Sequence, residues 1–268
     1  PNDAHPDHWG LSAFARLAVT LLEREQPDYR PTMIAYLVHR HDFPEPKGLL
    51  PAQPLLPPAA LFQMDPAAPW LSLELPREDA ILKSQALQEY RSQLPLLRGL
   101  LDSFVRTNEL FELEKPANLP QLDSGDLQEP RFWRDAQGQT IEPVQPDPSG
   151  DVLIRELLPA ADLTELFAAE RTDGCLVVCA VLRGTARAEL EYLIQVKAIG
   201  PDGVAHLRAQ SSRPSAGRLP ALSAGERIVA HIPAQAAGKP WIIAVEAEVR
   251  ERGWGVLDQT AWKILRVR

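Results

Sequence analysis

Two histidines three residues apart, with a carboxylate between them, stand near the start of the chain. They are His5 and His8, flanking Asp7, within the run Pro1-Asn2-Asp3-Ala4-His5-Pro6-Asp7-His8-Trp9-Gly10. On the first turn of a helix, positions three apart lie on one side, so His5 and His8 can face a common metal ion or substrate. Neutral imidazole is a good zinc ligand, and a neighbouring carboxylate can fix the tautomer of the ring. The spacing predicts half of a site for metal-assisted hydrolysis.

The same residues also suit a solvated helix start, because a proline such as Pro6 is tolerated in the first helical turn. A hydrolytic zinc site normally takes three protein ligands and leaves the fourth position to water. Only half of such a site is visible here, so the chain is expected to hold zinc weakly. No cap, strand or targeting segment precedes the motif. We therefore expect a piece or processed product of a longer protein, whose upstream part supplies the other ligands.

The elements around this motif indicate an α/β segment over residues 1–114. Apolar residues recur three and four apart from Trp9 to about Glu25, which predicts a helix. Residues 32–38 form a short apolar run, predicted as a strand buried on both faces. Prolines crowd residues 43–69, which predicts a long loop. A strand at 71–75, a helix from 76 and a further helix over roughly 95–109 complete the segment.

The second half of the chain has a different periodicity. Residues 115–150 are polar and rich in proline, and are predicted to be a linker. Beyond residue 150 the pattern changes to period two, with six or more short strands separated by turns such as 200–203. These features predict a β-sandwich over residues 151–268. The predicted fold class is thus α/β followed by an all-β sandwich domain.

Composition excludes some classes of function. The formal charge of −8 and the pI near 5.3 argue against nucleic-acid binding, which needs clustered Lys and Arg. No run of about 18 apolar residues is present, so no transmembrane segment is predicted. Cys175 and Cys179 fall on one face of a predicted strand, where buried thiols are preferred over a zinc or redox pair. No pattern indicates the oligomeric state.

Three segments, in order, carry a resemblance to a known family. They are the motif at 1–10 with its amphipathic helix, the helix at 83–93 with Tyr90 where histidine is usual, and Glu109-Leu110-Phe111. Together they resemble the PIG-L, or LmbE-like, family of zinc-dependent N-acetylglucosamine deacetylases. The resemblance implies a Rossmann-like α/β domain whose N-terminal half is missing here. It also implies one zinc ion and hydrolysis of the N-acetyl group on an amino sugar or glycoconjugate substrate.

By motif position, the resemblance implies a role for each residue of the first motif. His8 would bind zinc, His5 would be the charged donor that polarises the carbonyl and protonates the leaving amine, and Asp7 would orient His5. The family's N-terminal His-Pro-Asp-Asp-Glu motif, which brings two further ligands and the general base, is absent. Residues 41–45 hold a superficially similar run in the wrong order. The chain alone is therefore expected to be inactive.

Two alternative functions remain open. In the first, the α/β segment is a degenerate scaffold of a non-catalytic protein, and the β domain binds glycan or another chain. In the second, the metal is kept but the bond differs, for example another amide or an ester. The discriminating feature is whether a His-Pro-Asp-Asp-like motif lies upstream.

Other polar residues are weaker candidates. His39-Arg40-His41 follow the strand at 32–38, at the kind of strand end where open α/β sheets bind ligands, but ordinary surface polarity is preferred. For Lys83, Ser92 and Gln93, helix packing and capping are preferred over chemistry.

The β domain holds two further candidates. Its tryptophans can form a sugar platform, although core filling is preferred; they are Trp241, Trp254 and Trp262. Asp147 and Asp151 can bind calcium or simply form a turn. Their surroundings resemble the opening of accessory modules of secreted bacterial hydrolases, which favours a cell-envelope or secreted location over the cytoplasm.

Overall fold

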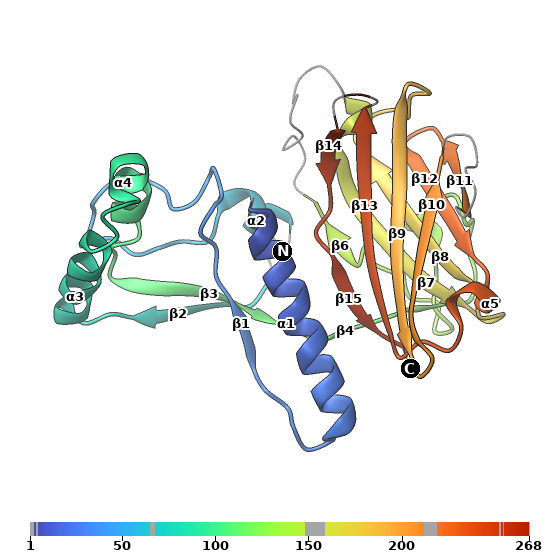
Figure 1. Cartoon of the computed structure of the whole chain (residues 1–268), viewed down its shortest axis with the longest axis horizontal. Coiled ribbons are helices and arrows are strands. Elements are labelled where there is room, and N and C mark those ends of the chain that lie inside the picture. Colours follow the sequence, from blue (N-terminus) through green and yellow to red (C-terminus); the bar gives the residue numbers. More distant parts are fainter. Residues whose placement is uncertain are drawn as a thin grey trace. The chain divides into compact units, whose positions relative to one another are not determined.

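The chain divides into two compact units, described here from a computed structural model (Figure 1). The larger unit comprises Trp9–Gln26 and Pro116–Arg268, and the smaller comprises Asn2–His8 and Pro27–Lys115. The structure describes residue 3 and residues 5–64, 68–147, 159–211, 219–251, 253 and 255–267. Within these ranges, no helix has the length and apolar character needed to cross a membrane.

The smaller unit is built on a three-stranded sheet in the order β1-β3-β2. Its strands are β1 (Met33–Ala35), β2 (Trp70–Glu74) and β3 (Asn108–Glu114), and its helices are α2 (Ala59–Met64), α3 (Arg77–Gln88) and α4 (Leu94–Ser103). Both strand pairs are antiparallel. A Rossmann-like domain rests on parallel strands joined by crossover helices, so that prediction is not confirmed by this sheet.

Several local predictions for this unit need correction. The expected strand at 32–38 is reduced to β1, whose residues are half-buried or exposed rather than covered on both faces. The expected helix over 95–109 ends at Ser103, and residues 108–114 form β3 instead. The last four residues of this strand, Phe-Glu-Leu-Glu, alternate apolar and polar side chains, which favours a strand. The proline-rich stretch at 43–69 also contains one short helix, α2.

A small apolar cluster ties the proline-rich loop to the sheet. Its buried members are Leu37, Phe43, Leu55, Leu61 and Leu110. Two buried polar side chains fasten the same loop: Asn108 accepts the backbone N–H of Leu55, and Arg106 donates to the carbonyls of Gly48 and Pro46. These bonds hold the chain that follows β1, which carries His39, against the rest of the unit.

The larger unit is one curled sheet of twelve strands (Figure 1). The strand order is β4-β15-β13-β9-β10-β11-β12-β8-β7-β5, with β14 beside β13 and β6 beside β7. The strands are β4 (Ala117–Asn118), β5 (Gln121–Leu122), β6 (Gln145–Pro146), β7 (Leu163–Arg171), β8 (Leu176–Leu182), β9 (Leu190–Gly200), β10 (Gly203–Gln210), β11 (Leu219–Ala224), β12 (Arg227–Ile232), β13 (Ile242–Glu251), β14 (Gly255–Gln259) and β15 (Lys263–Arg266). Short helical turns are η1 (Pro130–Phe132), η2 (Pro159–Ala161) and α5 (Ala234–Ala237).

The main core of this unit lies inside the curl of the sheet. Alternate residues of each strand point inward, as period-two sequences require. One half of the sheet contributes Tyr192, Ile194, Val196, Val245, Ala247 and Val249, and the other contributes Leu166, Ala168, Val178, Ala180, Ile228 and Ala230. The predicted β-rich domain is confirmed in this coarse sense. The halves are continuous, because β10 pairs in parallel with β11, so the chain forms one curled sheet rather than two separate ones.

Residues 116–147, expected from their composition to be linker, pack against the outer face of β7, β8 and β12. Trp133 is fully buried there and contacts Phe167 edge-on, with 6.0 Å between ring centroids. The indole N–H donates to the carbonyl of Asp126 at 3.0 Å. Leu122 and Ile141 are buried in the same cluster. The segment is thus polar overall, but a few buried apolar side chains hold it against the sheet.

Helix α1 (Pro6–Glu25) lies at its predicted position. It covers part of the outer face of the sheet at β13 and β15. Its residues Ala13, Leu17 and Leu21 recur four apart and form one apolar stripe. This stripe packs against Ile242, Ala244 and Ile264. At the end of the helix, the Arg24 guanidinium lies 4.0 Å from the Trp241 ring centroid, and Glu23 pairs with Arg266. The helix therefore belongs with the β-rich unit over most of its length.

Two glutamates of β13 are buried on the same outward side of the sheet. Glu246 and Glu248 are 6% and 4% exposed. The Gln195 amide donates to Glu246 at 2.6 Å, and Glu248 pairs with Arg250. Burial, reinforced by the neighbouring Glu248, raises the pKa of Glu246 to about 8, although Lys197, Arg250 and Arg208 act to lower it. At neutral pH Glu246 is therefore mostly uncharged.

Trp133→Ala tests the packing of the 116–147 segment. Removing a fully buried indole is expected to lower the free energy of unfolding of the β-rich unit by about 3–5 kcal/mol. Urea denaturation followed by circular dichroism measures this. Phe132→Ala is the matched control, because that ring is 51% exposed and its loss should cost far less. Equal destabilisation by the two substitutions would contradict the assignment of Trp133 as an anchor.

Glu246→Gln tests the buried carboxyl. A carboxyl with a raised pKa keeps its proton in the folded state after the unfolded chain has lost it, so its contribution to stability falls as pH rises from about 4.5 to about 8. The loss is on the order of a few kcal/mol. The variant, which cannot ionise, should show a flatter dependence of unfolding free energy on pH in that window. Glu226→Gln, at an exposed position, should follow the wild type. Identical pH slopes for wild type and Glu246→Gln would rule out the shifted carboxyl.

Candidate metal centre

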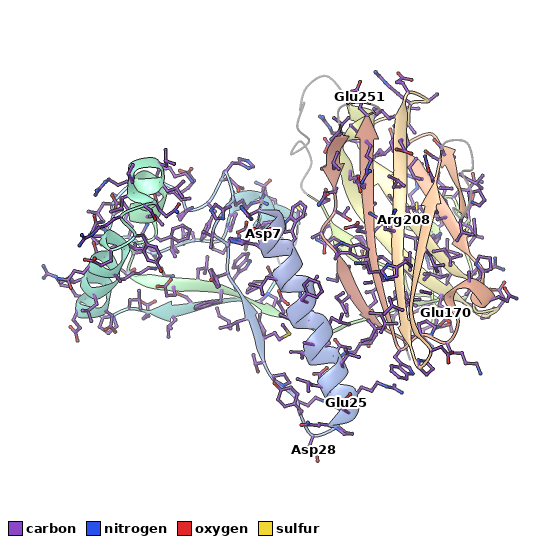
Figure 2. The ribbon with its side chains drawn as sticks, viewed as in Figure 1. Asp7, Glu25, Asp28, Glu170, Arg208 and Glu251 are labelled. Atoms are coloured by element: carbon purple, nitrogen blue, oxygen red, sulfur yellow. The ribbon has the colours of Figure 1, made fainter. Side chains whose placement is uncertain are left out.

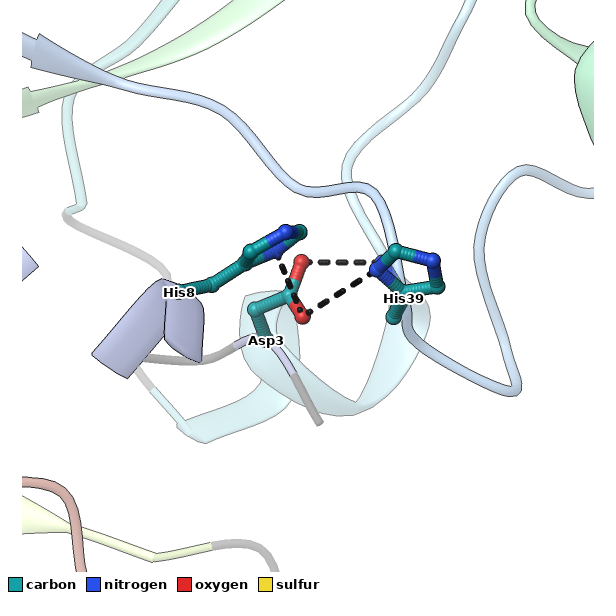
Figure 3. Close-up of side chains that lie close together, drawn as sticks. All are labelled: Asp3, His8 and His39. Atoms are coloured by element: carbon teal, nitrogen blue, oxygen red, sulfur yellow. Dashed lines mark hydrogen bonds and ion pairs between the residues drawn. The ribbon is translucent and has the colours of Figure 1, made fainter. Parts of the chain in front are cut away.

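The carboxylate of Asp3 organises a cluster within the smaller unit (Figure 3). Asp3 is 6% exposed. Its Oδ2 accepts the backbone N–H groups of Val38 and His39, both at 2.8 Å, and its Oδ1 accepts that of His5 at 2.9 Å. Residues 38 and 39 follow β1 in the chain. These bonds therefore join the N-terminal motif to the segment that leaves the sheet.

Two imidazoles face the same carboxylate. Asp3 Oδ1 lies 3.1 Å from His8 Nδ1 and 3.9 Å from His39 Nδ1. The His8 and His39 ring centroids are 4.9 Å apart. One ligand atom from each of Asp3, His8 and His39 lies within 4.8 Å of the others. A tetrahedral zinc ion with bonds near 2 Å places its ligands roughly 3.3 Å apart, so small movements would bring this set to metal-binding distance.

The electrostatics of Asp3 suit a cation. Burial acts to raise its pKa, but the hydrogen bonds from His39, Val38, His5 and His8 outweigh burial and lower the pKa below its ordinary value. The carboxylate is therefore negatively charged at neutral pH although it is nearly inaccessible. A buried anion of this kind is stabilised further by a metal ion or by a protonated imidazole beside it.

His39 supplies a second observation that fits a metal. Its Nδ1 is buried and forms no hydrogen bond, and its nearest charged neighbour is the Asp3 carboxylate at 3.9 Å. Buried polar atoms usually have a hydrogen-bond partner. When Nδ1 carries no proton, its lone pair in this position, 3.9 Å from an anion, is suited to accept a cation. The donor set of two imidazoles and one carboxylate is also one that zinc accepts.

His5 stands beside the cluster. Its ring centroid is 5.1 Å from that of His8 and 5.2 Å from that of His39. Its Nδ1 accepts the backbone N–H of Asp7 at 3.2 Å. The Asp7 carboxylate is 89% exposed and lies 3.9 Å from the same nitrogen. In the neutral ring the backbone bond leaves the proton on Nε2, so the Asp7 backbone, more than its side chain, orients His5.

The other candidate residues of the smaller unit lie outside the Asp3 cluster. Arg40 is buried against Asp42, with 2.6 Å between Nε and Oδ1, and His41 is exposed. Tyr90, at the position of the expected family histidine, is 60% exposed. Lys83 pairs with Glu109 at 2.5 Å, which agrees with a packing role. Ser92 and Gln93 are exposed between α3 and α4, and the Gln93 side chain does not cap α4.

The candidates of the β-rich unit are placed as follows. Trp241 and Trp262 pack beside α1, and each carries a cation over its ring, so neither is a bare sugar platform. Trp254 and Asp151 lie outside the described residues. The backbone N–H of Asp147 donates to Thr164. Both cysteines are free thiols, and burial raises the pKa of Cys179 to about 12, as expected of an inert core thiol.

Two members of the cluster were not assigned as ligands from the sequence. Asp3 stands within the N-terminal motif, but the sequence indicates no role for it, and His39 is marked only as a ligand-binding candidate at a strand end. Its position after an apolar run was the available signal. Nothing in the sequence pairs residue 3 with residues 38 and 39.

Comparison of the chain with protein-family models, with curated proteins and with solved structures gives no match.

Zinc titration tests the cluster. Because three donors gather where His8 alone was expected, we predict binding of one zinc ion per chain. His8→Ala and His39→Ala should each weaken binding by about 100-fold or more, since loss of even a supporting partner typically costs 10-fold to 100-fold. Competition with a chromophoric chelator at pH 7.5 measures this. His41→Ala, exposed and outside the cluster, is the control. Equal zinc affinity in all three variants would show that the cluster is not a metal site.

Proposed function

We propose that this chain takes part in zinc-dependent hydrolysis of an N-acetyl group on an amino sugar or glycoconjugate. The observation that carries the proposal is the gathering of Asp3, His8 and His39 around one point, with His5 at its edge. The resemblance of the N-terminal motif to the PIG-L family supplies the substrate class. The proposal includes zinc as the ion, a Rossmann-like deacetylase domain in the complete protein, and a cell-envelope or secreted location.

Each residue of the cluster has a separate role, which follows from its position. His8 and His39 offer imidazole nitrogens, and Asp3 offers an anionic oxygen already held by three backbone N–H groups. Zinc, when bound, supplies a Lewis acid for a carbonyl and lowers the pKa of a bound water. His5, whose Nδ1 accepts the Asp7 N–H, carries its proton on Nε2 in the neutral ring and can act as a donor. Such a donor can stabilise charge developing on an amide oxygen or protonate a departing amine.

One observation favours the non-catalytic alternative. The Asp3 carboxylate accepts three backbone N–H groups, which is also how a purely structural carboxylate joins two segments. In that case the cluster would bind a metal, or hold a proton between Asp3 and His8, without turning over a substrate. Measurements of metal content and of turnover separate the two functions.

The decisive experiment assays release of free amine from N-acetylglucosamine oligomers by the zinc-loaded product of the complete gene. His8→Ala should lose both zinc and activity. His5→Ala should keep zinc and lose roughly 10²-fold to 10³-fold in kcat, the usual size of removing one oxyanion donor. Asp7→Asn should lose less, because the Asp7 backbone rather than its exposed carboxylate contacts the His5 ring.

His41→Ala is again the matched control and should leave kcat unchanged. A protein that binds zinc stoichiometrically but hydrolyses no N-acetylated amino sugar would refute the deacetylase proposal and support the binding protein. Equal activity of His5→Ala and wild type would refute the role assigned to His5.

A further inference from the structure

A second candidate site lies on the outer face of the curled sheet, on β9 and β10. A cavity of about 230 Å³ opens there, and its polar and aromatic lining residues are Gln195, Lys197, His206, Arg208 and Trp262. All five belong to the larger unit, so the cavity is separate from the Asp3 cluster. We call it the β9–β10 groove. Arg208 is labelled on this face in Figure 2.

The strand register places the polar side chains in a compact block. Lys197 is opposite His206, and Gln195 is opposite Arg208. Residues two apart on one strand share a face, so all four side chains point outward while Val196 and Ala198 fill the core. Diagonal neighbours across two strands are roughly 7–8 Å apart at the backbone, which allows Lys197 and Arg208 to reach one small ligand.

The two cations of the groove are Lys197 and Arg208. Among the described residues, neither Lys197 nor Arg208 forms an ion pair, although both lie near enough to Glu246 to act to lower its pKa. The Lys197 ammonium instead lies 4.3 Å from the Trp262 ring centroid. A cation over an indole is held in place while its remaining N–H groups stay available to an acceptor. The indole therefore positions Lys197 without neutralising it.

The nearest acidic groups do not supply the missing charge. Glu246, the carboxyl closest in register to this block, is held by Gln195 and is mostly protonated at neutral pH, because burial and Glu248 raise its pKa. Glu248 is paired with Arg250 on its own strand. An excess of positive charge is thus left over the groove in a protein whose net charge is −8.

We propose that the β9–β10 groove binds a tetrahedral oxyanion, the phosphate or sulfate group of a small ligand. Arg208 presents a planar fork of N–H donors, Lys197 presents an ammonium held over an indole, and His206 presents a ring nitrogen. Together these side chains offer more donors than the two oxygens of a carboxylate would accept. A phosphate or sulfate offers enough oxygens to accept from all three residues. The Gln195 amide nitrogen is engaged by Glu246 and Glu248, so it is not counted among the donors.

Isothermal titration with inorganic phosphate, at low ionic strength and pH 7, tests the proposal. Lys197→Gln and Arg208→Gln should each weaken binding by about 10-fold or more, the usual size of one hydrogen bond to a charged group. Both side chains lie on the surface, so the variants should keep the wild-type circular dichroism spectrum. Lys239→Gln, at an exposed lysine outside the groove, is the matched control and should bind as the wild type does.

Further titrations distinguish the possible sources of the anion and separate this groove from the metal centre. Sulfate and glucose 6-phosphate are titrated in parallel with glucose; tighter binding of glucose 6-phosphate than of phosphate identifies a sugar phosphate, and equal binding identifies the free ion. His8→Ala should not change phosphate binding, which keeps this test independent of the metal centre. Undiminished binding in Lys197→Gln and Arg208→Gln, or no binding of phosphate or sulfate at millimolar concentration, would overturn the proposal.

Discussion

The strict alternation of side chains along β9 and β13 is the constraint on which the larger unit depends. Inward residues such as Val196 and Val245 close the core of the curl, so every second position must face outward. The outward-facing positions of β13 fall into two groups. Ile242 and Ala244 receive helix α1, whereas Glu246 and Glu248 lie farther along the strand. One strand therefore joins the core, the helix contact and the charged face.

The burial of the two glutamates follows from that division. The Gln195 amide of β9 contacts both carboxyls. Two adjacent carboxyls of low exposure cannot easily both be ionised, which explains why Glu246 tends to keep its proton. The same condition leaves Lys197 and Arg208 without a fully charged neighbour. The β9–β10 groove and the shifted carboxyl are thus two consequences of one arrangement.

In the smaller unit, the comparable constraint is the need to satisfy the buried Asp3 carboxylate. Three backbone N–H groups and the His8 ring surround it, and these come from segments more than thirty residues apart. A buried charge left without such partners would destabilise the fold by several kcal/mol. The hydrogen bonds that stabilise the carboxylate also bring His39 to His8. The candidate metal centre is therefore inseparable from the folding of this unit.

Local patterns in the sequence were sufficient to locate helix α1, several of the longer strands of the β-rich half, and the proximity of His5 to His8. Each depends on a period of two, three or four residues, which a single element imposes on its own sequence. They were not sufficient to predict β3, the packing of Trp133, or the antiparallel pairing of β1, β2 and β3. Those features depend on which distant strand pairs with which. The approach of Asp3 to His39 was likewise decided only by tertiary structure, because a buried carboxylate is satisfied by whichever backbone N–H groups the fold brings to it.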